Sequence, residues 1–457
     1  MEPSDVKTAE DVLALVDERA LTHVKVGVFD IDGIFRAKWM ARDKFASALK
    51  GGFGFCDVVL GWDSNDQLYE DPAVDVTGWH TGYPDAEVRL LPDTARDVAF
   101  EPDMVMVLGE FAGKWEGVCP RGTLRRVLKK ADDMGFAVKA AAEYEFFLFD
   151  ETPHSVREKG YRDLKPLTPG FFGYSGIRSS VHADLHLMFL EMCELMDFPV
   201  EGLHTETGPG VMEAAIKVDD ALVAADRAAL FKTFTKVFFQ RHDIMASFMA
   251  KWSMDYPGQS GHIHTSLTTK DGAPVFHDPK STYSMSDTMR WFVGGQQALM
   301  PELLSMTAST INSYTRLIPG FWAPTHANWA ADNRTTSLRV IEGSPKSQRV
   351  EYRVAAADAN PYLAMAAAIG SGLWGIENKV EPGEGVTGNA YAKKFPAKAA
   401  LPGSLGEAAA RLKRSKAARD LFGDAFVDHF SASRMWEERE YRRHVTDWEL
   451  ARYFEII

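Results

Sequence analysis

The chain has 457 residues, of which 46% are apolar and 25% are charged, and its formal net charge is −13. This composition is typical of a globular protein large enough for two domains. The negative charge argues against non-specific binding to nucleic acid or to an anionic membrane, although a local cluster of arginines can still bind an anionic substrate.

The three cysteines, Cys56, Cys119 and Cys193, are odd in number and widely spaced, which fits a reducing compartment better than a disulfide framework or a zinc site. Residues 1–5 are acidic and polar, unlike a signal peptide. No run approaches the roughly 20 apolar residues that span a bilayer. We therefore expect a cytoplasmic protein with neither a nucleic-acid nor a membrane partner.

The first 115 or so residues predict a small β-rich domain. An amphipathic helix is expected over residues 8–20, and a strand over 25–30 turns at Asp32-Gly33 into a returning strand. Further extended segments are expected around residues 87–90 and 104–108. The two domains are predicted as residues 1–117 and 118–457.

The second domain is predicted to contain both strands and helices. A helix capped by Thr123 precedes a strand that carries Glu143 and Glu145. A long helix is expected over residues 219–249, and another begins near residue 404.

The pair Glu143 and Glu145 leads directly into the apolar run 146–149. Because strand side chains alternate between faces, both carboxylates should lie on one face. Two like charges so placed repel each other unless a cation lies between them. A surface strand in water is the commoner explanation for a lone pair of this kind, but the apolar flank and four later elements favour a divalent-metal site.

These four elements are rich in metal-binding and anion-binding side chains. Each also has an ordinary explanation: a solvated glutamate, a core histidine, or a ladder of salt bridges between strands. Together they favour a functional site. The four elements are Glu206 and Glu213 around a Gly-Pro-Gly turn, His262 and His264 on one strand face, the alternating Arg349, Glu351 and Arg353, and the loop arginines Arg316, Arg334 and Arg339.

Five glutamates and one histidine form an oxygen-dominated ligand set, which suits Mg²⁺ or Mn²⁺ better than zinc or copper. The arginines suit carboxylate and phosphate oxygens, so metal and arginine together indicate phosphoryl transfer. No Walker-type loop is present, and the glycines at 52 and 54 lack the third glycine of a dinucleotide fingerprint.

Over nearly its full length the chain resembles the glutamine synthetase family, and in particular its γ-glutamyl-amide ligase branch. Five stretches match in the family's order: AEYEFFLFD (142–150), GHIHTSL (261–267), NSYTRLIPG (312–320), NRTTSLR (333–339), and RVEYR (349–353) leading to ANPYL (359–363). The resemblance implies an α+β fold, with an N-terminal β-grasp domain and a catalytic domain of an antiparallel sheet and surrounding helices. It also implies a homo-oligomer of twelve subunits in a double hexameric ring, with active sites between subunits.

By matching position, the resemblance implies three sets of ligand-binding residues, with Arg334 and Arg353 catalytic and Arg334 stabilising the transferring phosphoryl group. Two or three Mg²⁺ or Mn²⁺ ions would be held by Glu143, Glu145, Glu206, Glu213, His262 and Glu351. ATP would be contacted by Glu201, His264, Ser266, Arg334, Arg339 and Lys346, and L-glutamate by Gly258, Arg316, Arg334 and Arg353.

Two departures from the family pattern concern the ammonium site. Where the family has Pro-Gly-Tyr-Glu-Ala-Pro, whose glutamate takes a proton from ammonium, this chain has Trp322, and an indole cannot accept that proton. The family's Phe-Asp-Gly-Ser-Ser segment aligns with residues 55–59, Phe-Cys-Asp-Val-Val. We expect Trp322, with Cys56 and Asp57 from an adjacent subunit, to form a pocket for an organic amine.

The function predicted from the sequence is therefore ATP-dependent ligation of the γ-carboxylate of L-glutamate to a primary amine through γ-glutamyl phosphate. A glutamine synthetase that uses ammonium with a different base is the alternative. We place it second because an ammonium pocket needs carboxylates to replace the hydration of the ion and a base to deprotonate it. A non-catalytic structural or regulatory relative that keeps only the ring assembly is the third possibility.

Overall fold

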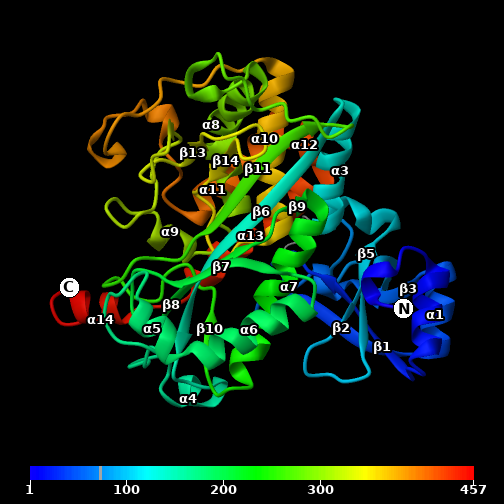
Figure 1. The fold of residues 1–457 in the computed structure, drawn as a ribbon. Helices are drawn as coiled ribbons and strands as arrows, with labels where there is room; N and C mark the ends of the chain where they lie inside the picture. Colours follow the sequence, from blue (N-terminus) through cyan, green and yellow to red (C-terminus); the bar gives the residue numbers. More distant parts are fainter. Residues whose placement is uncertain (71–74) are drawn as a thin grey trace.

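The computed structural model describes residues 1–70 and 75–457, which form two α+β parts, each built on its own sheet (Figure 1). The N-terminal part has a five-stranded sheet in the order β2-β1-β5-β4-β3. Its strands and helices are β1 (His23–Phe29), β2 (Phe35–Ala41), β3 (Phe53–Cys56), β4 (Asp85–Asp97), β5 (Val105–Phe111), α1 (Ala9–Glu18) and α2 (Arg42–Gly51).

The predicted N-terminal hairpin is present, and its turn is held by Asp30. The Asp30 carboxylate accepts backbone hydrogen bonds from Asp32 and Ile34 at 3.0 and 2.9 Å, which closes the turn between β1 and β2. The helix expected over 8–20 and the extended segments at 87–90 and 104–108 are also present, as α1, β4 and β5. β1 and β5 pair in parallel, whereas the other strand pairs of this sheet are antiparallel.

The larger part is built on a nine-stranded sheet whose main path runs β12-β13-β14-β11-β6-β8-β7. The expected antiparallel sheet is in fact mixed, because β12 and β13 are parallel. The strands are β6 (Phe136–Phe149), β7 (Val200–Thr205), β8 (Val211–Ile216), β9 (Asp219–Asp220), β10 (Met245–Ser247), β11 (Gly261–Thr269), β12 (Trp329–Ala331), β13 (Leu338–Ile341) and β14 (Arg349–Tyr352).

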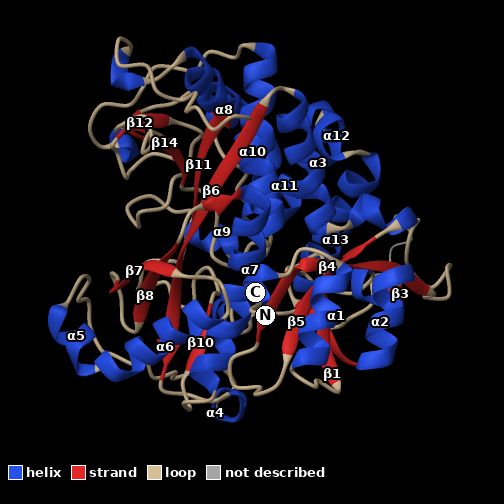
Figure 2. Ribbon diagram, turned by 45° about the vertical axis from the view of Figure 1, so that its right-hand side comes forward, coloured by secondary structure: helices blue, strands red, loops and turns tan. Residues whose placement is uncertain are grey.

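Helices α3, α7 and α10 pack directly on the central strands β6 and β11, and further helices lie behind them (Figure 2). The helices are α3 (Pro120–Asp133), α4 (Pro153–Glu158), α5 (Gly176–Val181), α6 (Ala183–Leu195), α7 (Ala221–Gln240), α8 (Asp287–Thr307), α9 (Ser313–Arg316), α10 (Pro361–Asn378), α11 (Leu405–Arg414), α12 (Lys416–Phe422), α13 (Asp424–Tyr441) and α14 (Asp447–Tyr453).

Two predicted helix boundaries were wrong. The helix expected to be capped by Thr123 begins at Pro120, with Cys119 as its N-cap, since Pro is favoured at the first helical position. The helix expected over residues 219–249 ends at Gln240. Asp243 takes a left-handed backbone conformation (φ 56°) and turns the chain, so that Met245–Ser247 continue as β10 along the edge of β6.

Helix α10 is buried on nearly all sides, as expected for a helix with an uninterrupted apolar surface. It crosses α8 at Gly295 and Gly375. A Cβ added to Gly295 would lie 2.5 Å from the Cα of Gly375 and 2.2 Å from the Ser371 carbonyl oxygen. The two helices can approach this closely only because both positions lack a side chain.

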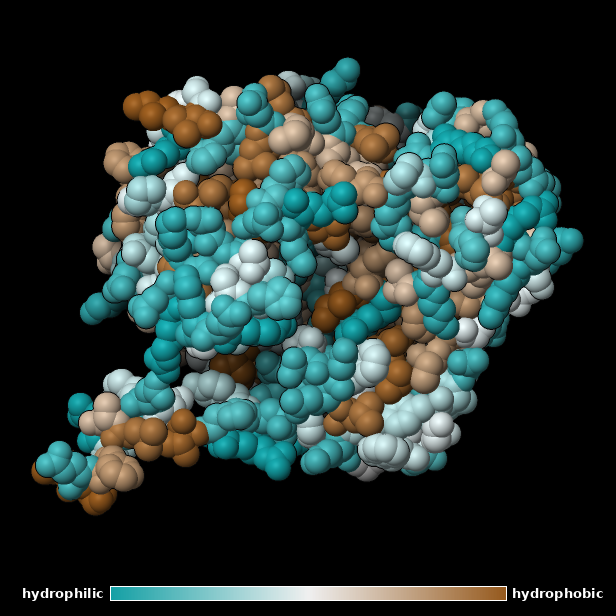
Figure 3. Space-filling view, turned by 90° about the horizontal axis from the view of Figure 1, so that it is seen from below, coloured by the Kyte–Doolittle hydropathy of each residue, from teal (hydrophilic) through white to brown (hydrophobic). Residues whose placement is uncertain are grey.

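The C-terminal segment projects from the body of the molecule and carries apolar side chains on its surface (Figure 3). Its exposed apolar residues are Val445, Trp448, Leu450, Tyr453, Phe454, Ile456 and Ile457. Such an exposed apolar group is typical of a surface that contacts another protein. Among the described residues, no helix has the length and apolar character needed to cross a membrane.

We expect Gly295→Ala to lower the free energy of unfolding by about 1–3 kcal/mol, because the new methyl group forces α8 and α10 apart. Gly51→Ala is the matched control, since no atom lies within 4 Å of the added Cβ at that helix end. Urea or thermal unfolding of both variants measures the difference. Equal stability of the two variants would contradict the close packing described here.

Candidate active site

A row of acidic and imidazole side chains crosses the centre of the large sheet. Glu145 on β6 is paired with Glu213 on β8, which is paired in turn with His204 on β7. Glu143 is paired with His262 on β11. Directly opposed residues in a sheet have Cβ atoms about 4.5–5.5 Å apart, so strand register brings these side chains together.

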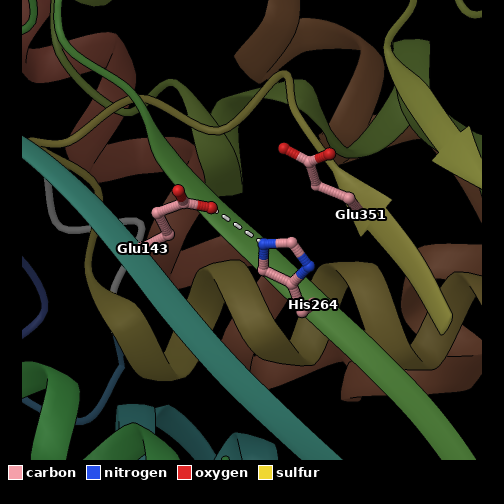
Figure 4. Close-up of side chains that lie close together, drawn as sticks. All are labelled: Glu143, His264 and Glu351. Atoms are coloured by element: carbon pink, nitrogen blue, oxygen red, sulfur yellow. Dashed lines mark hydrogen bonds and ion pairs between the residues drawn. The ribbon is translucent and has the colours of Figure 1, made fainter. Parts of the chain in front are cut away.

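The row continues on the other side of β11. His264 is paired with Glu351 on β14, and Glu351 is paired with Arg339 on β13. Glu143, His264 and Glu351 point toward one another (Figure 4), and each offers a ligand atom within 4.8 Å of the others. The Glu143 Oε2 atom lies 2.9 Å from Nε2 of His264.

A second group of potential metal ligands consists of His204, Glu206 and Glu213. The Nε2 atom of His204 lies 3.3 Å from a Glu213 oxygen, and its Nδ1 atom lies 3.7 Å from a Glu206 oxygen. The ring of Tyr174 stacks on His204 with centroids 4.4 Å apart, which orients the imidazole.

His262 has the properties of a neutral metal ligand. Burial and the nearby Arg353 guanidinium lower its pKa to about 3, so the imidazole is uncharged at neutral pH. Its Nδ1 lies 3.2 Å from Glu351, while its buried Nε2 has no hydrogen-bond partner among the described residues. A neutral ring held by a carboxylate through one nitrogen, with the other nitrogen free, is a common arrangement for a metal-binding histidine.

The pKa values of Glu213 and Glu143 are shifted in opposite directions. Burial and the neighbouring Glu143 raise the pKa of Glu213 far above its usual range. Burial opposes ionisation of Glu143 as well, but a hydrogen bond with His264 and another with Glu213 outweigh it and lower the Glu143 pKa. Divalent cations would remove the need for a shared proton between these carboxylates, and the oxygen-rich donor set with one free imidazole nitrogen fits Mg²⁺ or Mn²⁺.

Glu145 and Glu351 are held by neighbouring donors. The Ser260 backbone and hydroxyl groups both donate to Glu145. Glu351 accepts from Arg353 and, at 3.1 Å, from Arg339. Although burial opposes it, the pKa of Glu351 is lowered to about 2 by His262, which is charged in that acid range, and by Arg353, so this carboxylate is ionised at neutral pH.

The buried Arg316 holds the backbone that follows β14. It donates to the carbonyl oxygens of Val354 at 2.9 Å and Arg353 at 3.1 Å. A Cβ on Gly258 would lie 2.7 Å from the Arg316 Cγ, so the glycine leaves room for this side chain. Arg316 therefore supports the Arg353 backbone and Gly258 makes room for Arg316, while direct contact of these two residues with glutamate stays a prediction.

Arg334 and Trp322 line the same cavity, which has a volume of about 680 Å³. Tyr283, Asp332 and the segment 385–389 complete its wall. Arg334 is exposed and forms no ion pair within the part of the chain that the structure describes. Its guanidinium is thus available to an anionic ligand.

Other predicted site residues lie outside this central group. Glu201 is exposed on the edge strand β7, Ser266 is half-buried on β11, and Lys346 is exposed between β13 and β14. Cys56 and Asp57 lie in the N-terminal part. Asp57 is buried and accepts a hydrogen bond from the Trp115 indole at 3.3 Å, and neither residue lines the cavity beside Trp322.

One residue of the site, His204, had no predicted role, and Arg349 was predicted only as one of the arginines on a shared strand face. His204 stands two residues before Glu206, so the alternation argument used for Glu143 and Glu145 would have placed it on the same face as Glu206. Arg349, two residues before Glu351, donates to Nδ1 of His264 at 3.3 Å and fixes that ring.

Comparison with known proteins agrees with this geometry. The family model described as the catalytic domain of glutamine synthetase matches residues 117–453. The chain belongs to the glutamine synthetase family. It is therefore an ATP-dependent carbon–nitrogen ligase that acts on glutamate.

Relatives in this family are named for different reactions. The type-1 glutamine synthetase 2 of Dictyostelium discoideum is 44% identical over 466 residues, covering 100% of this chain and 88% of that protein. The glutamate–isopropylamine ligase of a Pseudomonas species is 35% identical and covers 100% of both chains. The γ-glutamylethanolamide synthetase of Streptomyces coelicolor is 34% identical, covering 98% of this chain and 95% of that protein.

The solved structure described as a GmaS/ADP complex matches with a TM-score of 0.84 over 97% of this chain and 99% of that chain. Its sequence identity of 24% means that this likeness concerns the fold. The fold expected from the family resemblance is thereby confirmed: a small N-terminal sheet and a large catalytic sheet with its helices.

We expect Mn²⁺ at one hundred times its dissociation constant to stabilise the protein by about 2.7 kcal/mol, because only the folded chain assembles the ligand row. Glu143→Gln should reduce this gain while leaving the metal-free protein about as stable, since the amide oxygen can still accept hydrogen bonds from His264 and the protonated Glu213. Thermal unfolding with Mn²⁺ and with EDTA measures both effects.

The control for this experiment is Glu158→Gln, which changes an exposed glutamate on α4. An equal Mn²⁺ response in the two variants would show that the metal binds elsewhere.

Proposed function

We propose that this protein joins the γ-carboxylate of L-glutamate to a primary amine at the expense of ATP, through γ-glutamyl phosphate. In the first step a γ-carboxylate oxygen attacks the γ-phosphorus of ATP and ADP leaves. In the second step the amine nitrogen attacks the γ-carbonyl carbon, phosphate leaves, and the nitrogen loses a proton.

The observation that carries the choice of an amine is Trp322. It occupies the position at which the family pattern has the glutamate that deprotonates ammonium, and it lines one cavity with Arg334. Its side chain is 56% exposed, so the indole offers an apolar surface to an incoming group. An apolar wall suits the carbon skeleton of an amine, whereas ammonium needs oxygen ligands in place of its hydration shell.

The second candidate is glutamine synthesis from ammonium. The relative from Dictyostelium, at 44% identity, is named as a glutamine synthetase and favours glutamine synthesis as the function. The two relatives named as amide ligases, at 35% and 34% identity over nearly the whole chain, favour the first. The third possibility, a non-catalytic role, is set aside because the family assignment makes this chain a ligase.

In this proposal Arg334 and Arg353 bind different substrates. Arg334 reaches the transferring phosphoryl group from the cavity, and Arg353 orients the glutamate from its buried place beside Glu351. The nucleotide would be surrounded by Ser266, His264, Glu201, Arg339 and Lys346. The carboxylates and His262 would hold two or three Mg²⁺ or Mn²⁺ ions, which would neutralise the negative charge of the ATP phosphates.

The assembly that we propose is the double hexameric ring. The exposed apolar C-terminal segment supports it, because these residues would be buried only against another chain. In a ring, the N-terminal part of an adjacent subunit would bring Cys56 and Asp57 to the amine pocket, which explains why they lie away from Trp322 within one chain.

Replacement of Arg334 tests its role in phosphoryl transfer. Arg334→Ala should lower kcat by about 10³-fold, since an arginine that stabilises a transferring phosphoryl group is worth this much or more. Its exposed side chain makes no ion pair in the described residues, so the melting temperature should not change. Steady-state ATP turnover and thermal unfolding measure the two effects, and a normal kcat would remove Arg334 from the reaction.

A panel of acceptors tests the substrate. With ATP, Mn²⁺ and glutamate, we expect faster phosphate release with at least one primary amine than with ammonium, and mass spectrometry should detect the γ-glutamyl amide. Trp322→Glu should raise ammonium use and weaken activity with bulky amines, whereas Trp322→Phe should keep the wild-type preference. Faster turnover of wild-type protein with ammonium than with every amine would favour glutamine synthesis instead.

A further inference from the structure

A second cavity, separate from the one beside Trp322, lies between α8, α10, α11 and the segment that follows α10. Its volume is about 1410 Å³, about twice that of the cavity at the active site. In Figure 1 the orange segment after α10 runs beside α8, and residues 397–399 of this segment pack on that helix. Nothing in the proposed ligase reaction uses this cavity.

The lining of the second cavity is rich in positive charge, although the whole chain carries a net charge of −13. Six Lys and Arg side chains line it, against three glutamates. Two of the glutamates are already engaged, Glu381 with Arg290 and Glu302 with the Ser415 hydroxyl. The cations are Lys393, Lys394, Lys398, Arg411, Arg414 and Lys416.

Most of these cations lack an anionic partner. Among the residues that the structure describes, five of the six form no ion pair, and the exception is Arg411, which pairs with Glu407. Clustered like charges repel one another, so an anion placed between them would be favourable. Lysine and arginine together are suited to phosphate groups.

The cavity also has an apolar floor. Leu299 of α8, Trp374 of α10, Val380 and Phe395 line it beside the cations. Trp374 and Phe395 are half-buried, and the Phe395 ring packs on His326 with centroids 5.1 Å apart. A binding site with apolar and aromatic walls and a few charged groups is typical of a small organic ligand, and a volume of this size far exceeds that of an inorganic ion.

The two cavities share a wall. Residues Gly385, Val386 and Thr387 line both of them. The chain just after this segment is hydrogen-bonded to the residues on each side of Arg334. The side-chain amide of Asn333 donates to the Gly388 carbonyl oxygen at 2.7 Å, and the Ala390 N–H donates to the Thr335 hydroxyl at 3.0 Å. The wall is therefore bonded to the side chains of both residues that flank Arg334, which gives it a route to that residue.

We propose that the second cavity binds a phosphorylated small molecule with a planar ring, of which a nucleotide is one example, and that its occupancy changes the rate of the ligase reaction through residues 385–390. The phosphates contact the cations of the 393–398 segment and of α11, and the ring lies against Trp374 and Phe395.

Calorimetry with GTP as the probe tests the binding, in the presence of a saturating non-hydrolysable ATP analogue and Mg²⁺ that occupy the active site. The full-length protein should bind one GTP per chain. Lys394→Glu/Arg414→Glu should raise the dissociation constant at least about tenfold, and added salt should weaken the wild-type binding. Both side chains are exposed, so the variant should fold, and its melting temperature checks this.

The matched control is Lys50→Glu/Lys413→Glu, which makes the same change of charge at exposed lysines that do not line the cavity. Unchanged GTP binding in the cavity variant, or equal weakening in the control, would overturn the site. Guanosine and inorganic tripolyphosphate separate the two parts of the ligand. Tripolyphosphate that binds as tightly as GTP would overturn the role of the ring.

The coupling is tested by phosphate release from ATP with the best acceptor. Saturating GTP should change kcat or the KM for ATP in the wild type and in the control, but not in the cavity variant. A rate that GTP leaves unchanged would overturn the coupling, and a GTP effect that persists in the cavity variant would assign it to the active site.

Discussion

The structure depends on one electrostatic constraint, the placement of like-charged carboxylates opposite each other at the centre of a sheet. Glu145 and Glu213 are direct cross-strand neighbours, and Glu143 lies within hydrogen-bonding reach of Glu213. Directly opposed like charges destabilise a sheet, and burial increases that cost. The fold tolerates the arrangement because β6, β8 and β11 are fixed by a large apolar core on the other face, where α7 and α10 pack.

A second layer of residues keeps the row in position. Arg339 and Arg353 both donate to Glu351, while Ser260 donates to Glu145. Arg316, which has no acidic side chain as a partner in the described contacts, instead holds the backbone at Arg353. These interactions fix the side chains before any ligand binds, which lowers the entropy that ligand binding must overcome.

The sequence predicted which side chains share a strand face better than it predicted which strands are neighbours. Alternation along a strand correctly placed Glu143 with Glu145 and would also have found His204. It gave no information on which strand lies beside which, so the pairing of His264 with Glu351 and the parallel pair β12–β13 could not be foreseen. The helix expected over 219–249 was too long because its apolar pattern continues beyond Gln240, whereas the turn at Asp243 depends on pairing of β10 with β6.

Arg334 lies between two residues whose side chains are bonded to the segment that continues from the shared wall of the two cavities. Most arginines of the central site are fixed by carboxylates or carbonyl oxygens, but Arg334 makes no ion pair in the described part of the chain. Its neighbours Asn333 and Thr335 are instead bonded to the segment that separates the cavities, and Trp329 donates to Gly383 at 2.6 Å in the same segment. Because the guanidinium has no ion-pair partner among residues 1–70 and 75–457, its nearest restraints come from these neighbours and so from that wall. If Arg334 acts on the phosphoryl group as we propose, a charge held in this way would respond to what lies on either side of the wall, whereas one fixed by a buried carboxylate would not.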